Sequence, residues 1–163
     1  MGFLEFLEQT AVATFVRESS SMLGFPAFLF LHTLGLSFLV GANSVVAIRV
    51  LGMASTIPLQ PLKRLFPFMW LGLVLTVVSG LGLAMAKATT LMLNPILLIK
   101  LVLIAFAVVL MFLLEKKVFP YAVVFRKIEP GDGRLMAAGL LILWTAVMTA
   151  GRLIAYSGTI FGE

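Results

Sequence analysis

The chain has 163 residues, of which 61% are hydrophobic and only 12% are charged, and its mean hydropathy is +1.14. So little polar surface excludes a water-soluble domain of this size and predicts an integral membrane protein. The formal charge of +5 does not indicate nucleic-acid binding, because most Lys and Arg residues lie in short loops between apolar runs. The lack of cysteine excludes disulfides, iron–sulfur clusters and thiol catalysis.

The first apolar stretch, residues 3–18, is too short and too charged to span a membrane. Its residues Leu4, Leu7, Ala11 and Phe15 recur at spacings of three and four, which is the pattern of an amphipathic helix. We expect a short helix that lies in the membrane interface, with a frayed N-terminus as the alternative.

Four longer apolar runs follow, each close to the ~20 residues that cross ~30 Å of hydrocarbon. They cover residues 24–48, 66–86, 95–114 and 135–156. The third run opens with Asn94-Pro95, where Asn can cap a helix and Pro suits its first turn. The sequence therefore predicts an all-α fold, with residues 1–163 forming a single transmembrane domain built as a four-helix bundle.

The basic residues are distributed unequally between the two sides of this bundle. The connections after the first and third runs hold most of the 12 Lys and Arg residues: Arg49, Lys63, Arg64, Lys116, Lys117, Arg126, Lys127 and Arg134. An excess of basic residues marks the cytoplasmic side of a membrane. We therefore expect both termini on the outer, periplasmic side of a bacterial cytoplasmic (inner) membrane.

Polar side chains inside the spans lie at similar depth. At about 1.5 Å per residue, His32 lies ~12 Å, Lys100 ~8–9 Å and Arg152 ~6 Å from the outer end of its span. Ser79 and Gly80 fall in the same layer. Ionisable groups are costly in a membrane and mark a function by default, and no acidic residue lies within the four spans to pair with these cations.

These positions suit an anionic and partly apolar ligand, and haem b fits that description. A quinone, a phospholipid head group or another carboxylate would also satisfy the cations. His32 would be the metal ligand, the two cations would meet the propionates, and Ser79-Gly80 would leave room for the ring. The candidate cofactor-binding residues are His32, Ser79, Gly80, Lys100, Met148, Arg152 and Tyr156.

A chain with one histidine cannot form a bis-histidine site alone. Met148 lies one turn inside Arg152 and is a candidate second ligand; a five-coordinate iron and a site shared by two chains are alternatives. The further alternatives for His32 are a structural hydrogen bond to a neighbouring helix and proton handling.

Five short motifs spread over nearly the whole chain resemble an uncharacterised bacterial four-helix transmembrane family. They are Arg17-Glu18-Ser19, His32-Thr33-Leu34-Gly35, Arg49-Val50-Leu51-Gly52, Asn94-Pro95 with Lys100, and Gly151-Arg152-Leu153-Ile154-Ala155-Tyr156. More distantly, the chain is similar to the copper-resistance D proteins and the HemJ-type protoporphyrinogen oxidases. The resemblance to the HemJ type implies bound haem.

Three functions remain open from the sequence. The first is a haem b-binding membrane protein or membrane subunit of a redox complex, with other redox subunits or a second copy as partners within the lipid bilayer. The second is a cofactor-free anchor that binds lipid or a partner's carboxylates. The third is copper handling through Met22, Met85, Met92 and His32. The chain shows no hydrolase or kinase signature.

Overall fold

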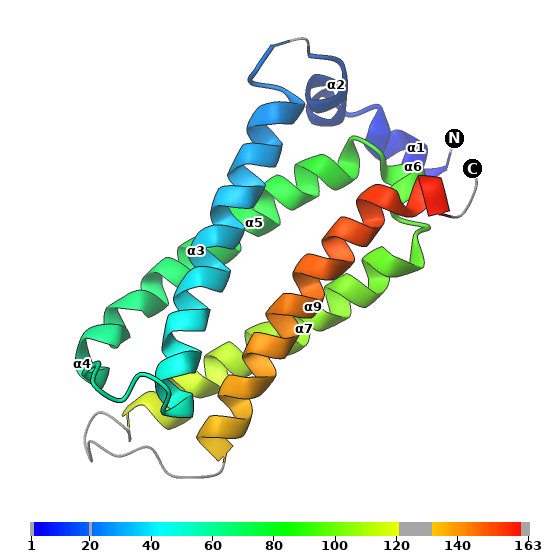
Figure 1. The fold of residues 1–163 in the computed structure, drawn as a ribbon. Coiled ribbons are helices and arrows are strands. Elements are labelled where there is room, and N and C mark those ends of the chain that lie inside the picture. Colours follow the sequence, from blue (N-terminus) through cyan, green and yellow to red (C-terminus); the bar gives the residue numbers. More distant parts are fainter. Residues whose placement is uncertain (1, 20, 121–131, 161–163) are drawn as a thin grey trace.

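The computed structural model describes residues 2–19, 21–120 and 132–160, and within these ranges every regular element is helical. Four helices dominate (Figure 1): α3 (Phe25–Leu51), α5 (Phe66–Met85), α7 (Pro95–Leu113) and α9 (Asp132–Ile160). Each is long and apolar enough to cross a membrane. The predicted all-α four-helix transmembrane fold is confirmed, and the chain is a multi-pass membrane protein.

The helix ends follow local signals in the sequence. Helix α3 runs three residues beyond its predicted end and stops at Gly52, whose φ of 91° gives a left-handed C-cap. The predicted cap of α7 is confirmed, because Asn94 Oδ1 accepts the Ile96 N–H at 2.9 Å. At its other end α7 continues into a π-helical turn, η2 (Leu114–Val118). Helix α9 is longer at both ends than predicted.

The N-terminal segment forms two helices, α1 (Phe3–Glu8) and α2 (Ala11–Glu18), so the prediction of one continuous helix over 3–18 is wrong. Thr10 separates the two helices, since its hydroxyl accepts the Ala13 N–H and caps α2. Because of this break, the side chains of α2 do not continue the 3.6-residue periodicity of α1. As a result, α2 packs against α5 with Ala13 and Val16 fully buried, whereas Ala11 and Phe15 of the predicted apolar stripe are exposed.

Three short helices in the connections escaped the sequence analysis: α4 (Leu59–Leu62), η1 (Lys63–Leu65) and α6 (Ala88–Leu91). Each has only three or four residues, which is too few for an apolar periodicity to be recognised. They mark the two ends of the bundle (Figure 1). We call the end near α1, α2 and the last turn of α9 the α6 end, and the opposite end the α4 end.

The four long helices are not packed equally. Helix α3 packs against α5 and α9, and α9 packs against α7, whereas α5 and α7 have no comparable contact. At the α4 end α5 is linked to the segment that directly follows α7. Trp70 Nε1 donates to Glu115 Oε2 at 3.0 Å, and the Phe66 and Phe119 rings meet edge to face at 5.1 Å. Towards the α6 end the contact is lost, since no residue of α7 before Ala107 is buried. The bundle is therefore compact at the α4 end and more open at the α6 end.

The closest contact is the crossing of α3 and α5. A Cβ on Gly35 would lie 2.6 Å from Thr76 Oγ1, and a Cβ on Gly72 would lie 2.7 Å from the Gly35 carbonyl oxygen. Small residues allow helix backbones to approach in lipid, where no hydrophobic force draws helices together. Gly35 and Gly72 therefore set the distance between these two helices.

Replacing Gly35 with Ala should destabilise the bundle by about 1–3 kcal/mol, because the new methyl group overpacks the crossing. Gly41→Ala is a matched control on the same helix, since nothing lies within 4 Å of its Cβ position. Thermal unfolding in detergent should show a lower midpoint for G35A and an unchanged or higher midpoint for G41A. Equal unfolding midpoints for G35A and G41A would contradict a close contact between α3 and α5 at Gly35.

Helix α1 is tied to the bundle by one carboxylate. Glu8 Oε1 accepts from the Thr89 hydroxyl at 2.7 Å and from the Thr89 N–H at 2.8 Å. These two hydrogen bonds, helped by the nearby charge of Arg17, hold the pKa of Glu8 below its usual value of 4.5. Since the folded state has the lower pKa, the contact stabilises above the unfolded-state pKa and is lost as the pH falls through the folded-state value.

Acidification below pH 4.5 should therefore release α1. The chain has no cysteine, so a nitroxide on F6C reports on α1 alone. Its mobility should rise as the pH falls through this range. In the E8Q background it should be high at every pH. If the mobility rose with falling pH in the E8Q background as well, this would contradict the proposed role of the Glu8–Thr89 hydrogen bonds.

Candidate functional site

The candidate site is built around His32, a half-buried side chain on the inward face of α3. Its Nδ1 lies 3.2 Å from the hydroxyl oxygen of Ser79 on α5, which is buried. The ring also lies against Gly80, where a Cβ would approach Cε1 to 3.0 Å. Gly35, three residues after His32, forms the close crossing with α5. That crossing brings the histidine within reach of Ser79.

The hydrogen bonds of Ser79 indicate which nitrogen of a neutral His32 ring carries the proton. Its hydroxyl lies 2.5 Å from the Leu75 carbonyl oxygen, which can only accept, so the hydroxyl proton is directed there. The Ser79 oxygen is then left to accept a hydrogen bond, and we infer that His32 Nδ1 is the donor across the 3.2 Å contact. A neutral imidazole protonated at Nδ1 has an unprotonated Nε2 with a lone pair available to a metal or a proton.

Lys100 on α7 brings a positive charge to the same site. The side chain is half-buried and close enough to His32 for the two groups to interact electrostatically. Its Nζ lies against Gly151 of α9, where a Cβ would come within 3.3 Å. Within the described ranges the one ion pair joins Arg17 to Glu18, so Lys100 has no carboxylate partner there.

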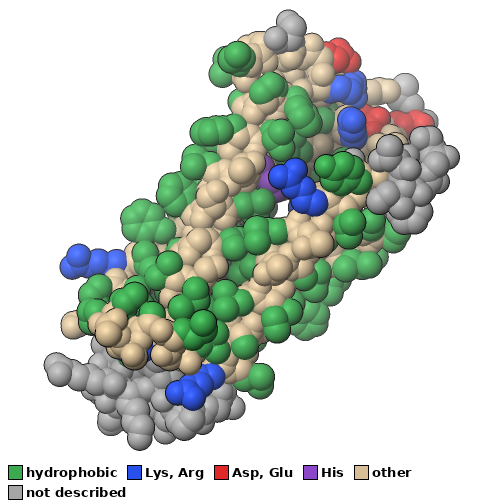
Figure 2. All heavy atoms as spheres, in the orientation of Figure 1, with side chains coloured by type: hydrophobic (Ala, Val, Ile, Leu, Met, Phe, Trp, Pro, Cys, Tyr) green, Lys and Arg blue, Asp and Glu red, His purple; other side chains and the backbone are tan. Residues whose placement is uncertain are grey.

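All four long helices therefore contribute to one layer near the α6 end. Figure 2 shows the purple histidine beside a basic side chain, next to a gap between α3 and α9. This gap lies in the part of the bundle where α7 is least packed. Four predicted site residues, His32, Ser79, Gly80 and Lys100, are thus close together. Gly151 joins them and was missed, although it directly precedes Arg152 in the sequence.

The other three predicted residues lie on α9 and are more accessible. Arg152 is exposed, Met148 is 42% exposed and Tyr156 is 57% exposed. Met148 precedes Gly151 by three residues and so lies one turn from the Lys100 contact, on a similar side of α9. The enclosed part of the site thus has one cation, Lys100, and Arg152 lies at its edge.

Comparisons of the chain with protein-family models, with curated proteins and with solved structures find no match. The resemblance noted above therefore remains a prediction from the sequence. The described residues contain no group of three or more His, Asp or Glu side chains, so a classical multidentate metal site is not seen among them.

The assigned tautomer can be tested directly because the chain has one histidine. With ¹⁵N-labelled histidine, nitrogen NMR at neutral pH should show a protonated Nδ1 and an unprotonated Nε2. In S79A the anchoring acceptor is lost, so a mixture of the two tautomers is expected. A protonated Nε2 in the wild-type protein would contradict the assignment.

Proposed function

We propose that this protein binds haem b and transfers electrons within a membrane, alone or as the membrane subunit of a redox complex. The observation that carries the proposal is the 3.2 Å contact between His32 Nδ1 and the Ser79 hydroxyl. Metal-ligating histidines commonly donate their second ring N–H to a fixed acceptor, which sets the ring orientation and tautomer. With Nδ1 as the donor, His32 would have this arrangement, and Nε2 would be left for the iron.

The neighbouring residues fit the other parts of haem. Lys100 offers a cation with no competing carboxylate in the described spans, and a haem propionate would pair with it. Because Gly80 and Gly151 have no side chains, His32 can lie close to the backbone of α5 and Lys100 close to that of α9. When bound, the iron would supply reversible one-electron chemistry at a potential that the protein sets through its ligands and surroundings.

The protein's own residues would bind and orient the group. Ser79 holds the His32 ring, the close α3–α5 crossing fixes its position, and the apolar helices restrict water. Met148 is the proposed second ligand, because it lies one turn from Gly151. A five-coordinate iron and a site shared between two copies remain alternatives. Arg152 is a second, more exposed partner for the propionates.

The membrane orientation is part of the proposal. The exposed basic side chains Lys63, Arg64, Lys116, Lys117 and Arg134 lie at the α4 end. By the positive-inside rule this end would face the cytoplasm, and the site would lie in the outer half of a bacterial inner membrane. An electron-transfer partner would then approach from the periplasmic side or within the bilayer.

A cofactor-free anchor is the second candidate, and the same hydrogen bond supports it. A polar contact between two helices, such as that of His32 with Ser79, can serve helix association alone. Copper handling is a third candidate. Its thioether ligands would include Met22, 87% exposed, and Met92, 42% exposed, while the nearby Lys100 would oppose a bound cation.

The first experiment is an absorption spectrum of the detergent-purified protein, oxidised and then reduced with dithionite. A Soret band and a sharp reduced α band are expected. His32→Ala should abolish them. Thr33→Ala should keep them, since Thr33 is exposed and its hydroxyl donates to its own helix at Leu29.

The outcomes separate the candidates. A featureless spectrum of protein purified from its native membrane would favour the anchor. Bound copper that is lost in H32A would favour copper handling. A haem spectrum that survives in H32A would overturn the assignment of His32 as the ligand.

A further inference from the structure

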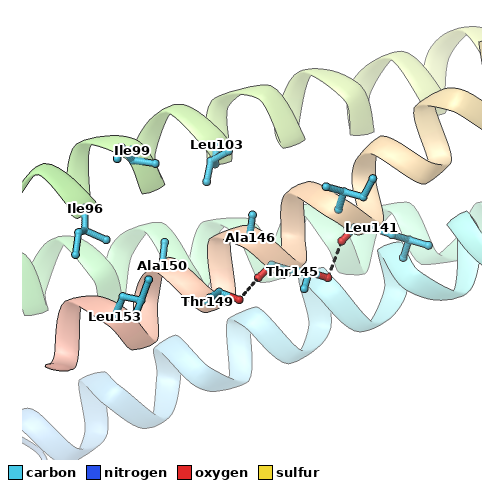
Figure 3. Close-up of a pocket in the computed structure, with 10 residues that line it drawn as sticks. Ile96, Ile99, Leu103, Leu141, Thr145, Ala146, Thr149, Ala150 and Leu153 are labelled. Carbon is cyan, nitrogen blue, oxygen red and sulfur yellow. Dashed lines mark hydrogen bonds between the residues drawn. The ribbon is translucent and has the colours of Figure 1, made fainter. Parts of the chain in front are cut away.

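A second feature lies on the far side of α9 from the Lys100 contact. A groove of about 660 Å³ lies between α7 and α9. Figure 3 shows the residues that line it. Its walls are almost wholly apolar, and the α7 wall is formed by Ile96, Ile99 and Leu103. Both helices are membrane-spanning and several of the lining residues are exposed, so the groove opens to the surrounding lipid.

The only polar side chains of the groove are already satisfied by their own helix. The Thr145 hydroxyl donates to the Leu141 carbonyl at 2.7 Å, and the Thr149 hydroxyl donates to the Thr145 carbonyl at 2.9 Å (Figure 3). A partner helix in a membrane is commonly held by small residues and by hydrogen bonds between helices. This groove offers bulky aliphatic walls with its hydroxyls engaged, which suits a hydrocarbon chain better than a helix.

Positive charge lies at one end of the groove. Its lining reaches the α6 end at Leu153 on α9 and Ile96 on α7. Arg152, exposed and without a carboxylate partner in the described ranges, directly precedes Leu153. The N-terminus of the 19-residue helix α7, one residue before Ile96, adds the positive end of its dipole.

We propose that the groove is a binding site for an anionic phospholipid from the leaflet at the α6 end. One acyl chain lies between α7 and α9, and the phosphate pairs with Arg152. Lipid chains are as apolar as the groove, so leaving the bilayer gives the chain no hydrophobic gain. Selectivity must therefore come from the charged head group. The groove lies on the opposite face of α9 from the Lys100 contact, and Arg152 is the one residue that it shares with the haem proposal.

The test uses nanodiscs with equal amounts of phosphatidylglycerol and phosphatidylcholine, followed by native mass spectrometry of the lipids that stay bound. The wild-type protein should retain phosphatidylglycerol preferentially. In R152Q the ratio of bound phosphatidylglycerol to phosphatidylcholine should fall about fivefold, because the phosphate of the bound lipid loses its basic partner. Lys87→Gln, which removes an exposed charge at the same end, is the matched control and should keep the ratio.

A second variant tests the groove itself. Thr149→Leu fills the space with a larger side chain and should lower the amount of both lipids retained. Val78→Leu, on the exposed face of α5, should not. The haem spectrum of T149L should equal that of the wild type, which keeps this test independent of the haem proposal.

Three results would overturn the inference. One is an unchanged lipid ratio in R152Q. Another is unchanged retention in T149L. The third is a shift of T149L from dimer to monomer, which would show that a second copy, rather than a lipid, occupies the groove.

Discussion

The crossing of α3 and α5 is the contact on which the candidate site depends. Gly35 and Gly72 allow the two backbones to touch, and this closeness places the His32 ring on Ser79 and Gly80 one turn away. A larger residue at either glycine would separate the helices and remove the acceptor of Nδ1. The chemistry of the histidine is thus controlled by a steric property of two residues that carry no functional group.

The rest of the bundle varies in packing along its length. At the α4 end a continuous core joins all four long helices, and Trp70 and Glu115 link α5 to the turn after α7. At the α6 end α7 contributes no buried residue before Ala107. This division gives the protein a rigid part that holds the helices together. It also leaves an open part where an apolar ligand could enter from the bilayer.

The two intramembrane cations have different surroundings and, in our proposals, different main roles. Lys100 is half-buried, near His32 and against Gly151, so it belongs to the enclosed site. Arg152 is exposed beside the end of the α7–α9 groove and can reach the interface. Neither cation has a carboxylate partner in the described spans, so each requires an anion from a ligand. In our proposals the haem propionate and the lipid phosphate are these anions.

Sequence alone determined the four spans, because length and apolarity follow directly from the thickness of the bilayer, and it determined the Asn94 cap, because capping is local. It also placed His32, Ser79, Gly80 and Lys100 in one layer, since depth follows from counting residues along a helix. Only the tertiary structure decided which faces meet. The Thr10 break rotated α2 relative to the predicted apolar stripe, and Gly151 came to lie against Lys100 while Arg152 stayed exposed. Helix rotation and pairing depend on packing between distant segments, which no local pattern records.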